Sequence, residues 1–325
     1  MSDHLPEIAG PVLVLGGAGF IGSNLVARLV AEGHRPRVMA RPSRSGANLR
    51  RVMDKIDLIH GDFMDDAVLR VALRGVHTVY HLITTTFPNM VIESSNYDLL
   101  SNLLPTIRML EIARETGVRR IVYASSGGTV YGEPLQIPIP EHHPLAPKSA
   151  YGQSKLTIEN YLSFYARTTP LEVSILRMSN PYGPQQNIYG AQGLLAVAMG
   201  CVLDGRALKV FGAGNSVRDY IYIDDVVEAM LAASNAAPCV LNISSGEGRS
   251  VNDVIAAVEA ASGQRIERQA LPERPGDVAV SILDNQRARH LLSWEPKVAF
   301  AEGVARSWAA LQGSLIPDTG RARHP

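Results

Sequence analysis

Cysteine is scarce in this chain, and neither sign of charge is in excess. Two cysteines, Cys201 and Cys239, occur in 325 residues. They are too few for a disulfide framework, and no C-x-x-C pair indicates zinc, so we expect no metal site. The 31 basic and 31 acidic side chains balance, which argues against a surface for nucleic acid or for an anionic membrane.

Long apolar runs are also lacking. No stretch approaches the roughly 18 apolar residues of a membrane span, and the N-terminus lacks the basic and apolar segments of a signal peptide. With so little cysteine, these absences predict a cytoplasmic protein without a membrane partner. Residues 313–325 are polar and aperiodic, and we expect them to form a flexible tail.

Short β-rich runs alternate with helical patterns through the first half of the chain. Strands are expected at Val12–Leu15, Arg37–Ala40, Asp57–His60, Thr78–Leu82, Arg120–Ala124 and Val173–Arg177. Helices are expected at Ser23–Glu32, Asp65–Leu73, Ser94–Thr116 and Ala150–Arg167. Pro105 should kink the third helix or split it at Leu104. This alternation predicts an α/β fold with a doubly wound parallel sheet and helices on both faces.

After Met178 the pattern changes to loops rich in Gly, Pro and Asn, with shorter elements between them. Helices are expected near 194–203, 225–234 and 251–262, and a strand near 208–211. We therefore expect one domain over 1–178, to which a strand and a helix return from about 220–245. A smaller mixed α/β lobe for the substrate should occupy 179–312.

The sequence Gly16-Gly17-Ala18-Gly19-Phe20-Ile21-Gly22 lies between the first expected strand and the first expected helix. In such a turn the backbone can approach a pyrophosphate closely, and the helix N-terminus offers free N–H groups and a favourable dipole. A glycine triplet alone is weak evidence, but its place between strand and helix predicts a dinucleotide site in a Rossmann domain.

Tyr151 and Lys155 are four residues apart in an expected helix, so both lie on one face. A nearby cation favours a phenolate, and we expect Lys155 to lower the pKa of Tyr151 toward the range of a general base. The preceding segment ends in Ser125, Ser126 and Thr129. This places hydroxyls at the carboxyl edge of the sheet, where open α/β sheets bind ligands.

Together these motifs resemble those of the extended short-chain dehydrogenases/reductases. The segments Arg218–Asp225 and Arg274–Asp277 narrow the resemblance to the nucleotide-sugar epimerase/dehydratase branch, and within it to the UDP-glucose 4-epimerases. The resemblance extends from about Pro11 to Leu311, with the motifs in the expected order. It implies an enzyme of surface-polysaccharide biosynthesis that acts on a nucleotide-diphosphate sugar.

The resemblance also implies roles for individual residues. Tyr151 would be the base for the sugar 4-hydroxyl, and Lys155 would bind the nicotinamide ribose. Cofactor contacts are implied for Gly16, Gly19, Phe20, Ile21, Gly22, Arg41, Asp62, Phe63, Asn102, Tyr151 and Lys155. Substrate contacts are implied for Ser126, Asn180, Arg218, Arg274 and Asp277. The planar fork of Arg suits the oxygens of a diphosphate.

The chain departs from the family pattern in two features, the catalytic hydroxyl and the cofactor site. The first departure is that the catalytic Ser or Thr of the family aligns with Gly127, so Ser126 is the nearest substitute, followed by Ser125 and Thr129. The Asp-Glu pair of the 4,6-dehydratases aligns with Gly128 and Thr129, which disfavours dehydration.

The second departure concerns the cofactor. NAD-dependent members place an Asp at the end of the second strand, where this chain has Ala40, followed by Arg41 and Arg44. These arginines suit a 2′-phosphate, although they are equally compatible with solvated loop positions. NAD is our first expectation, and NADP is the alternative.

The implied reaction is epimerisation by transient oxidation at C4 with a tightly bound cofactor. An NADP-dependent 4-reductase and a non-catalytic dinucleotide sensor are the alternatives, and retention of Tyr151 and Lys155 disfavours the sensor. The resemblance further implies a homodimer formed through the helices Ser94–Thr116 and Ala150–Arg167. From the sequence alone, their apolar faces equally suit packing against the sheet.

Overall fold

The computed structural model describes residues 8, 10–42, 47–87, 96–190, 192–274 and 277–315. The strands are β1 Val12–Leu15, β2 Arg37–Ala40, β3 Asp57–His60, β4 Thr78–His81, β5 Arg120–Ser126, β6 Glu172–Met178, β7 Asn180–Tyr182, β8 Leu208–Phe211, β9 Val217–Tyr222, β10 Val240–Ile243, β11 Gly248–Ser250, β12 Arg268–Leu271 and β13 Val280–Ser281. The α-helices are α1 Phe20–Ala31, α2 Asp66–Leu73, α3 Asn96–Asp98, α4 Leu104–Thr116, α5 Gly127–Val130, α6 Ala150–Thr168, α7 Leu194–Asp204, α8 Ile223–Asn235, α9 Val251–Ser262, α10 Gln286–Leu292 and α11 Phe300–Leu315.

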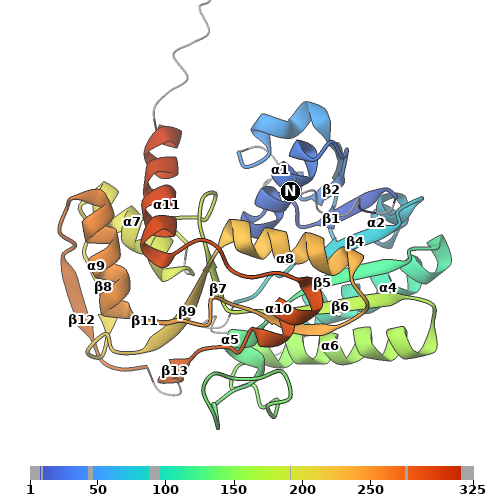
Figure 1. Ribbon diagram of the computed structural model, residues 1–325. Helices are drawn as coiled ribbons and strands as arrows, with labels where there is room; N and C mark the ends of the chain where they lie inside the picture. Colours follow the sequence, from blue (N-terminus) through green and yellow to red (C-terminus); the bar gives the residue numbers. More distant parts are fainter. Residues whose placement is uncertain are drawn as a thin grey trace, which may run out of the picture.

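A seven-stranded parallel sheet forms the centre of the molecule, in the order β10-β6-β5-β4-β1-β2-β3 (Figure 1). The predicted doubly wound sheet is therefore confirmed, and β1, β2 and β3 have the predicted bounds. The strand order reverses between β1 and β4, and such a switch point opens a crevice at the carboxyl ends of the strands.

The two faces of the sheet pack into different cores because strand side chains alternate. In β1, Val12 and Val14 join one buried cluster, which also holds residues of α1 and α8. Leu13 and Leu15 join a second cluster with residues of α2, α4 and α6. Helices thus cover both faces, and β1 is a continuous apolar run for that reason.

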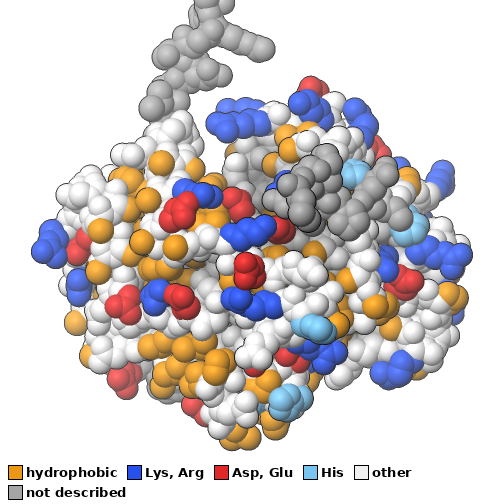
Figure 2. Space-filling view, in the orientation of Figure 1, with side chains coloured by type: hydrophobic (Ala, Val, Ile, Leu, Met, Phe, Trp, Pro, Cys, Tyr) orange, Lys and Arg blue, Asp and Glu red, His pale blue; other side chains and the backbone are white. Residues whose placement is uncertain are grey.

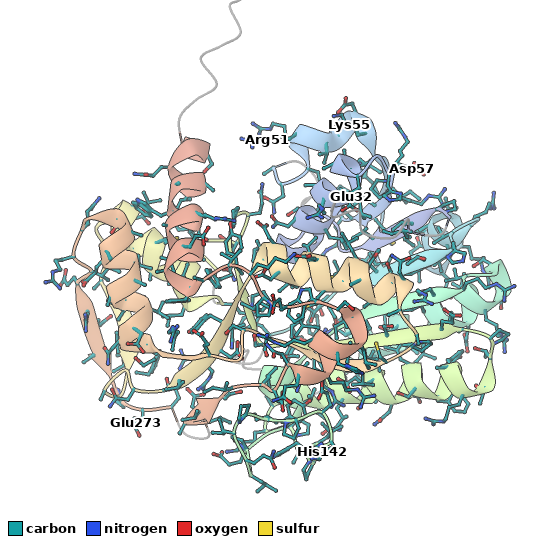
Figure 3. All side chains as sticks on the ribbon, viewed as in Figure 1. Glu32, Arg51, Lys55, Asp57, His142 and Glu273 are labelled. Carbon is teal, nitrogen blue, oxygen red and sulfur yellow. The ribbon has the colours of Figure 1, made fainter. Side chains whose placement is uncertain are left out.

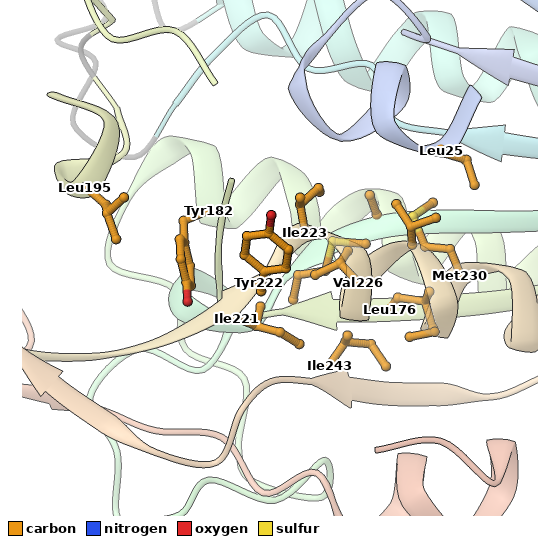
Figure 4. Close-up of a cluster of buried hydrophobic side chains, with 14 of the residues drawn as sticks. Leu25, Leu176, Tyr182, Leu195, Ile221, Tyr222, Ile223, Val226, Met230 and Ile243 are labelled. Atoms are coloured by element: carbon orange, nitrogen blue, oxygen red, sulfur yellow. The ribbon is translucent and has the colours of Figure 1, made fainter. Parts of the chain in front are cut away.

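The smaller lobe is built from two short sheets and shares the first of these cores. Strands β7, β9, β11 and β13 form one sheet, and β8 pairs in parallel with β12. Figure 4 shows the shared core: Leu25 and Leu176 of the sheet domain lie in one continuous apolar layer with Ile223 and Tyr182. Strand β10 pairs with β6 of the central sheet, and residues of α8 pack in the same core.

The third predicted helix is divided before Pro105. Helix α3 is followed by a π-helical turn at Leu99–Leu103, and α4 begins at Leu104 with Pro105 in its first turn. Proline is tolerated there because the first N–H groups of a helix lack intrahelical partners. The predicted start at Ser94 lies outside the described residues.

Figure 2 shows basic and acidic side chains interspersed over the visible face. Within the described ranges, no helix is both long enough and apolar enough to cross a membrane. Helix α11 continues to Leu315, and residues 316–325 of the expected tail lie outside the described part of the chain.

Candidate active site

The glycine turn after β1 has the close packing that a pyrophosphate cradle requires. Gly16 has a φ of 83°, in the left-handed region that favours glycine. A Cβ on Gly22 would lie 2.3 Å from the carbonyl oxygen of Gly16. A side chain at Gly22 would therefore push the helix away from the turn.

Helix α1 begins directly after this turn with its first N–H groups uncapped by a side chain. Gly19 is the N-cap residue and makes no side-chain hydrogen bond. Phe20, Ile21 and Gly22 form the first turn, where N–H groups lack intrahelical acceptors. An anion fits there, so the residues present fit the pyrophosphate of a dinucleotide.

The residues expected near the adenosine of the cofactor lie at and just after the carboxyl ends of β2 and β3. Ala40 is buried at the end of β2, and Arg41 is exposed. Asp62 is exposed, and one of its carboxylate oxygens accepts from the N–H of Met64 at 2.9 Å. Phe63 is buried with its ring centre 5.2 Å from that of His81. Arg44 lies outside the described residues.

Tyr151, Ser126 and Lys155 meet at the carboxyl edge of β5. Ser126 lies near enough to Tyr151 to lower the pKa of its phenol as a hydrogen-bonding neighbour. The ammonium of Lys155 donates to the carbonyl of Ala124 at 2.8 Å and lies 5.8 Å from the centre of the Tyr151 ring. Ser126 belongs to β5 because this strand extends two residues beyond the predicted end.

Burial makes the largest contribution to the pKa shifts of Tyr151 and Lys155. Burial raises the pKa of Tyr151 to about 12, against the opposing effect of the Ser126 hydrogen bond and with a smaller contribution from Asp98. Burial lowers the pKa of Lys155 to about 8, although Glu159 and Asp98 act in the opposite direction. The pKa of Tyr151 is thus raised and not lowered toward the range of a general base, contrary to the expectation based on Lys155, because removal of water from the phenol is the largest effect on it.

A side chain at Gly127 would meet closely packed neighbours. A Cβ there would lie 2.4 Å from a methyl group of Leu283 and 3.1 Å from the carbonyl of Arg177. Of the three proposed substitutes, Ser126 is the one that acts on the pKa of Tyr151. Ser125 donates to Glu159 instead, and Thr129 donates to the carbonyl of Ser126 at 3.3 Å.

Asn102 belongs to a buried polar cluster at the same edge of the sheet. Its amide donates to Asp98 at 2.7 Å and to the hydroxyl of Thr85 at 2.9 Å, and its oxygen accepts from the N–H of Thr85 at 2.9 Å. The hydroxyl of Thr86 donates to the same oxygen of Asp98. Asp98, Thr85 and Thr86 were not predicted from the sequence. The available signal was the run of three threonines, 84–86, that begins two residues after the predicted strand end at Leu82.

A second buried network supports the strand ends behind Ser126. The guanidinium of Arg177 on β6 donates to both carboxylate oxygens of Glu159 on α6, the shortest distance being 2.7 Å. Its remaining nitrogen donates to the hydroxyl of Tyr131 at 3.1 Å. Because Ser125 also donates to Glu159, this ion pair ties β5, β6 and α6 together beside the candidate catalytic residues.

The four substrate residues implied by the resemblance beyond Ser126 lie in the smaller lobe. The amide of Asn180 on β7 donates to the carbonyl of Asp219 at 2.9 Å. Arg218 on β9 is half-buried and donates to the carbonyl of Val217 at 2.8 Å. The guanidinium of Arg274 lies 3.6 Å over the centre of the Phe211 ring.

Arg274 follows Glu273 on the exposed loop after β12 (Figure 3). The N–H of Asp277 donates to the carbonyl of Arg274 at 3.3 Å. Both intervening residues, Pro275 and Gly276, lie outside the described residues. The stacking on Phe211 supports the Arg274 guanidinium from one face and leaves its N–H edge available to an anion.

Comparison with known proteins places this geometry among nucleotide-sugar enzymes. A family model for the NAD dependent epimerase/dehydratase family matches residues 12–244. The UDP-glucose 4-epimerase of Mycolicibacterium smegmatis is 37% identical over 301 residues, which cover 91% of this chain and 96% of that protein.

Two solved structures are similar over nearly their whole length. One is the UDP-glucose 4-epimerase of Thermotoga maritima with UDP-glucose, at a TM-score of 0.88 and 34% identity over 94% of this chain and 99% of that chain. The other is the UDP-glucose 4-epimerase of Thermus thermophilus in complex with NAD, at a TM-score of 0.87 and 35% identity over 93% and 99% of the two chains.

Proposed function

This chain belongs to the NAD-dependent epimerase/dehydratase family, and we propose that it epimerises the sugar of a UDP-sugar at C4. The single observation that carries this proposal is the meeting of Ser126, Tyr151 and Lys155 at the carboxyl edge of β5. The relatives and solved structures named above act on UDP-glucose, which supports UDP as the nucleotide.

Tyr151 is the proton acceptor in this proposal. It takes the proton of the sugar 4-hydroxyl and returns it after the 4-keto sugar has turned over in the site. Bound NAD supplies a reversible acceptor for the C4 hydride and a positive charge that favours the phenolate. Ser126 lies beside the phenol and is placed to orient the 4-hydroxyl. Lys155 and the glycine turn hold the dinucleotide.

The smaller lobe holds the diphosphate. Arg218, Arg274 and Asn180 supply donors, with Asp277 on the same loop as Arg274. Binding of the diphosphate keeps the keto sugar attached while its ring turns. Binding energy at a distance from C4 thereby controls the position of the reacting carbon. Dehydration is disfavoured because Gly128 and Thr129 carry no carboxylate, and the hydroxyl of Thr129 is bonded to the backbone.

The cofactor in this proposal is NAD, as the family description and the NAD complex of the Thermus relative support. Ala40 and exposed Arg41 favour the alternative, NADP-dependent reduction of a 4-keto sugar. The two functions differ in stoichiometry, because an epimerase recycles its cofactor and a reductase consumes it.

We also propose a homodimer formed by the segment 96–116 and α6. Large apolar side chains on these segments are exposed, namely Tyr97, Leu99, Leu100, Tyr161 and Phe164. A second copy that presents the same face would cover them. Light scattering should give twice the chain mass, and Leu100→Glu with Phe164→Glu should halve it. A cytoplasmic location is consistent with the two unpaired cysteines.

The test begins with the denatured purified protein, from which the released nucleotide is identified as NAD or NADP. Fresh protein is then incubated with UDP-, dTDP- and GDP-sugars without added cofactor. Interconversion of 4-epimers at constant absorbance at 340 nm is the expected result. Tyr151→Phe should reduce turnover about 10²- to 10⁴-fold while UDP-sugar binding is retained, and unchanged turnover would refute the assignment.

A further inference from the structure

The small cavity beside Tyr151 and Lys155 is lined in part by a buried carboxylate with no role in the proposal above. The cavity has a volume of about 10 Å³ and is lined by Asp98, Asn102, Tyr151, Ser154 and Lys155, together with Ile83, Thr84, Thr86 and Ile158. Asp98 is only 3% exposed. One of its oxygens accepts from Thr86 and Asn102.

The other oxygen of Asp98 has no hydrogen-bond partner among the described residues. Leaving a carboxylate oxygen buried and unpaired is costly unless a compensating charge lies nearby. The donors that Asp98 does have, a hydroxyl and an amide, are both neutral. The compensating charge must therefore come from across the cavity.

Lys155 carries the buried positive charge that complements the negative charge of Asp98. It is 6% exposed, and its ammonium donates to the neutral carbonyl of Ala124. The groups that face it from the surrounding elements are the ring of Tyr123 on β5 at 4.7 Å, Tyr151 and Glu159 on its own helix, His81 on β4, and Asp98 on α3. Only Glu159 and Asp98 among them are carboxylates.

The two carboxylates are not equivalent. Glu159 is engaged by the guanidinium of Arg177 at 2.7 Å and by Ser125, so its charge is already compensated. Asp98 forms no ion pair in the described part of the chain. The four buried charges therefore divide into two neutral pairs, Arg177 with Glu159 in direct contact, and Lys155 with Asp98 across the cavity.

We propose that Asp98 is a positioning residue: its carboxylate is the counter-charge that keeps Lys155 protonated and fixes the pH range in which Tyr151 and Lys155 work. The cavity between them has room for one water molecule, which can donate to the unpaired oxygen of Asp98 and accept from Lys155. Asp98 also holds Asn102 and Thr86 in place. The assignment of Tyr151 as the base rests on the proposed function, whereas the pairing of Asp98 with Lys155 does not.

The test is a double-mutant cycle measured by urea unfolding, without substrate. Asp98→Asn keeps an oxygen for Thr86 and Asn102 but removes the charge. It should lower the folding equilibrium constant about a hundredfold or more, and the loss should largely disappear in the K155M background. Thr86→Val is the matched control, since it removes a hydrogen bond of the same cluster without changing charge, and it should cost the same in both backgrounds.

An equal cost of Asp98→Asn with and without Lys155 would overturn the proposal. If Asp98→Asn alone fails to fold, folding of the D98N/K155M variant supports the charge pair, and its failure to fold refutes it. With UDP-sugar turnover as the second readout, the pH optimum of kcat should move to lower pH by about one unit, because the negative charge raises the pKa of both Tyr151 and Lys155. A uniform loss of kcat at every pH, with the optimum unmoved, would show a merely structural role. Absence of turnover in the wild-type protein would refute the proposed function but leave the unfolding cycle decisive.

Discussion

Ser126, the last residue of β5, lies beside Tyr151 in the first turn of α6 and lowers the pKa of its phenol. A Cβ at Gly127 would lie 2.4 Å from a methyl group of Leu283, so Ser126 is the residue from which we expect the hydroxyl next to the tyrosine.

Ser126→Ala should reduce kcat by about tenfold to a hundredfold with little change in stability, since it removes one hydrogen bond at the reacting group. Ser125→Ala is the comparison, because Ser125 donates to buried Glu159 instead. We expect that variant to lower the free energy of unfolding by about 1 kcal/mol or more. Initial rates and urea midpoints measured on both variants separate the two roles. Equal activity of Ser126→Ala and the wild type would show that the Ser126 hydroxyl does not assist Tyr151.

Gly22→Ala should weaken retention of the dinucleotide and lower stability by about 1–3 kcal/mol, because its Cβ would lie 2.3 Å from the Gly16 carbonyl. Gly313→Ala in α11 is the matched control. No atom lies within 4 Å of a Cβ built there, so that change should be neutral or slightly stabilising. Cofactor content after gel filtration and thermal midpoints provide the measurements. A Gly22→Ala protein that retains its full content of dinucleotide would argue against the glycine turn as the site of the pyrophosphate.

His81 should make the protein less stable in acid. It is buried, and burial with a smaller effect of Lys155 lowers its pKa to about 3. Between pH 6.5 and 3 the unfolded chain carries a proton at His81 that the native state lacks, so stability falls with decreasing pH by up to about 1.4 kcal/mol per unit. His81→Gln should flatten this part of the curve. His290→Gln, on an exposed residue of α10, should leave it unchanged, and identical slopes in all three proteins would exclude His81 as the cause.

Lys155 should produce a rise in stability at alkaline pH. Burial lowers its pKa to about 8 in the native state, against an ordinary value of 10.5. Below pH 8 both states carry the proton, and between the two values only the unfolded state does. Stability therefore increases with pH across this window and then levels off. Urea unfolding from pH 7 to 10.5 should show the rise in the wild type and not in Lys155→Met. A rise of the same size in both would place its origin elsewhere.

Arg218→Ala and Arg274→Ala should each raise KM for the sugar nucleotide by roughly tenfold or more, since each removes charge-assisted hydrogen bonds to a diphosphate. Arg206→Ala is the matched control. Its guanidinium also lies over a ring, 5.8 Å from the centre of Tyr189, and bonds Asp204 on the lobe surface, yet it has no proposed ligand. Steady-state kinetics on the three variants provide the test. Unchanged KM in both Arg218→Ala and Arg274→Ala would refute the proposed binding of the diphosphate by these arginines.

The sequence predicted the bounds of β1, β2 and β3 correctly. In β1 all four residues are apolar and buried, whereas β3 at the edge of the sheet keeps only Leu58 and Ile59 as apolar residues between exposed Asp57 and His60. The end of β5 was placed too early, since Ser125 and Ser126 read as loop residues. Their strand conformation depends on pairing with Arg177 and Met178 of β6, which local sequence does not show.

The candidate site was predictable where spacing along one element decides the geometry, as for Tyr151 and Lys155. It was not predictable where separate elements meet. Asp98 reaches the cavity through the π-helical turn that divides the helix, and no pattern specifies such a turn. The direction of the Tyr151 pKa shift was also inaccessible, because helical spacing gives the distance to a cation but not the loss of water around the phenol.

The apolar layer that joins the sheet to the lobe (Figure 4) limits how this chain can be divided. Val226 and Met230 of α8 and Ile243 of β10 cover a face that belongs to the first half of the sequence. A fragment ending near residue 178 would leave that face open to water and prone to aggregation. The half of the chain with the proposed dinucleotide site is therefore not an independent folding unit. Its tertiary structure is completed only when α8 and β10 pack against it.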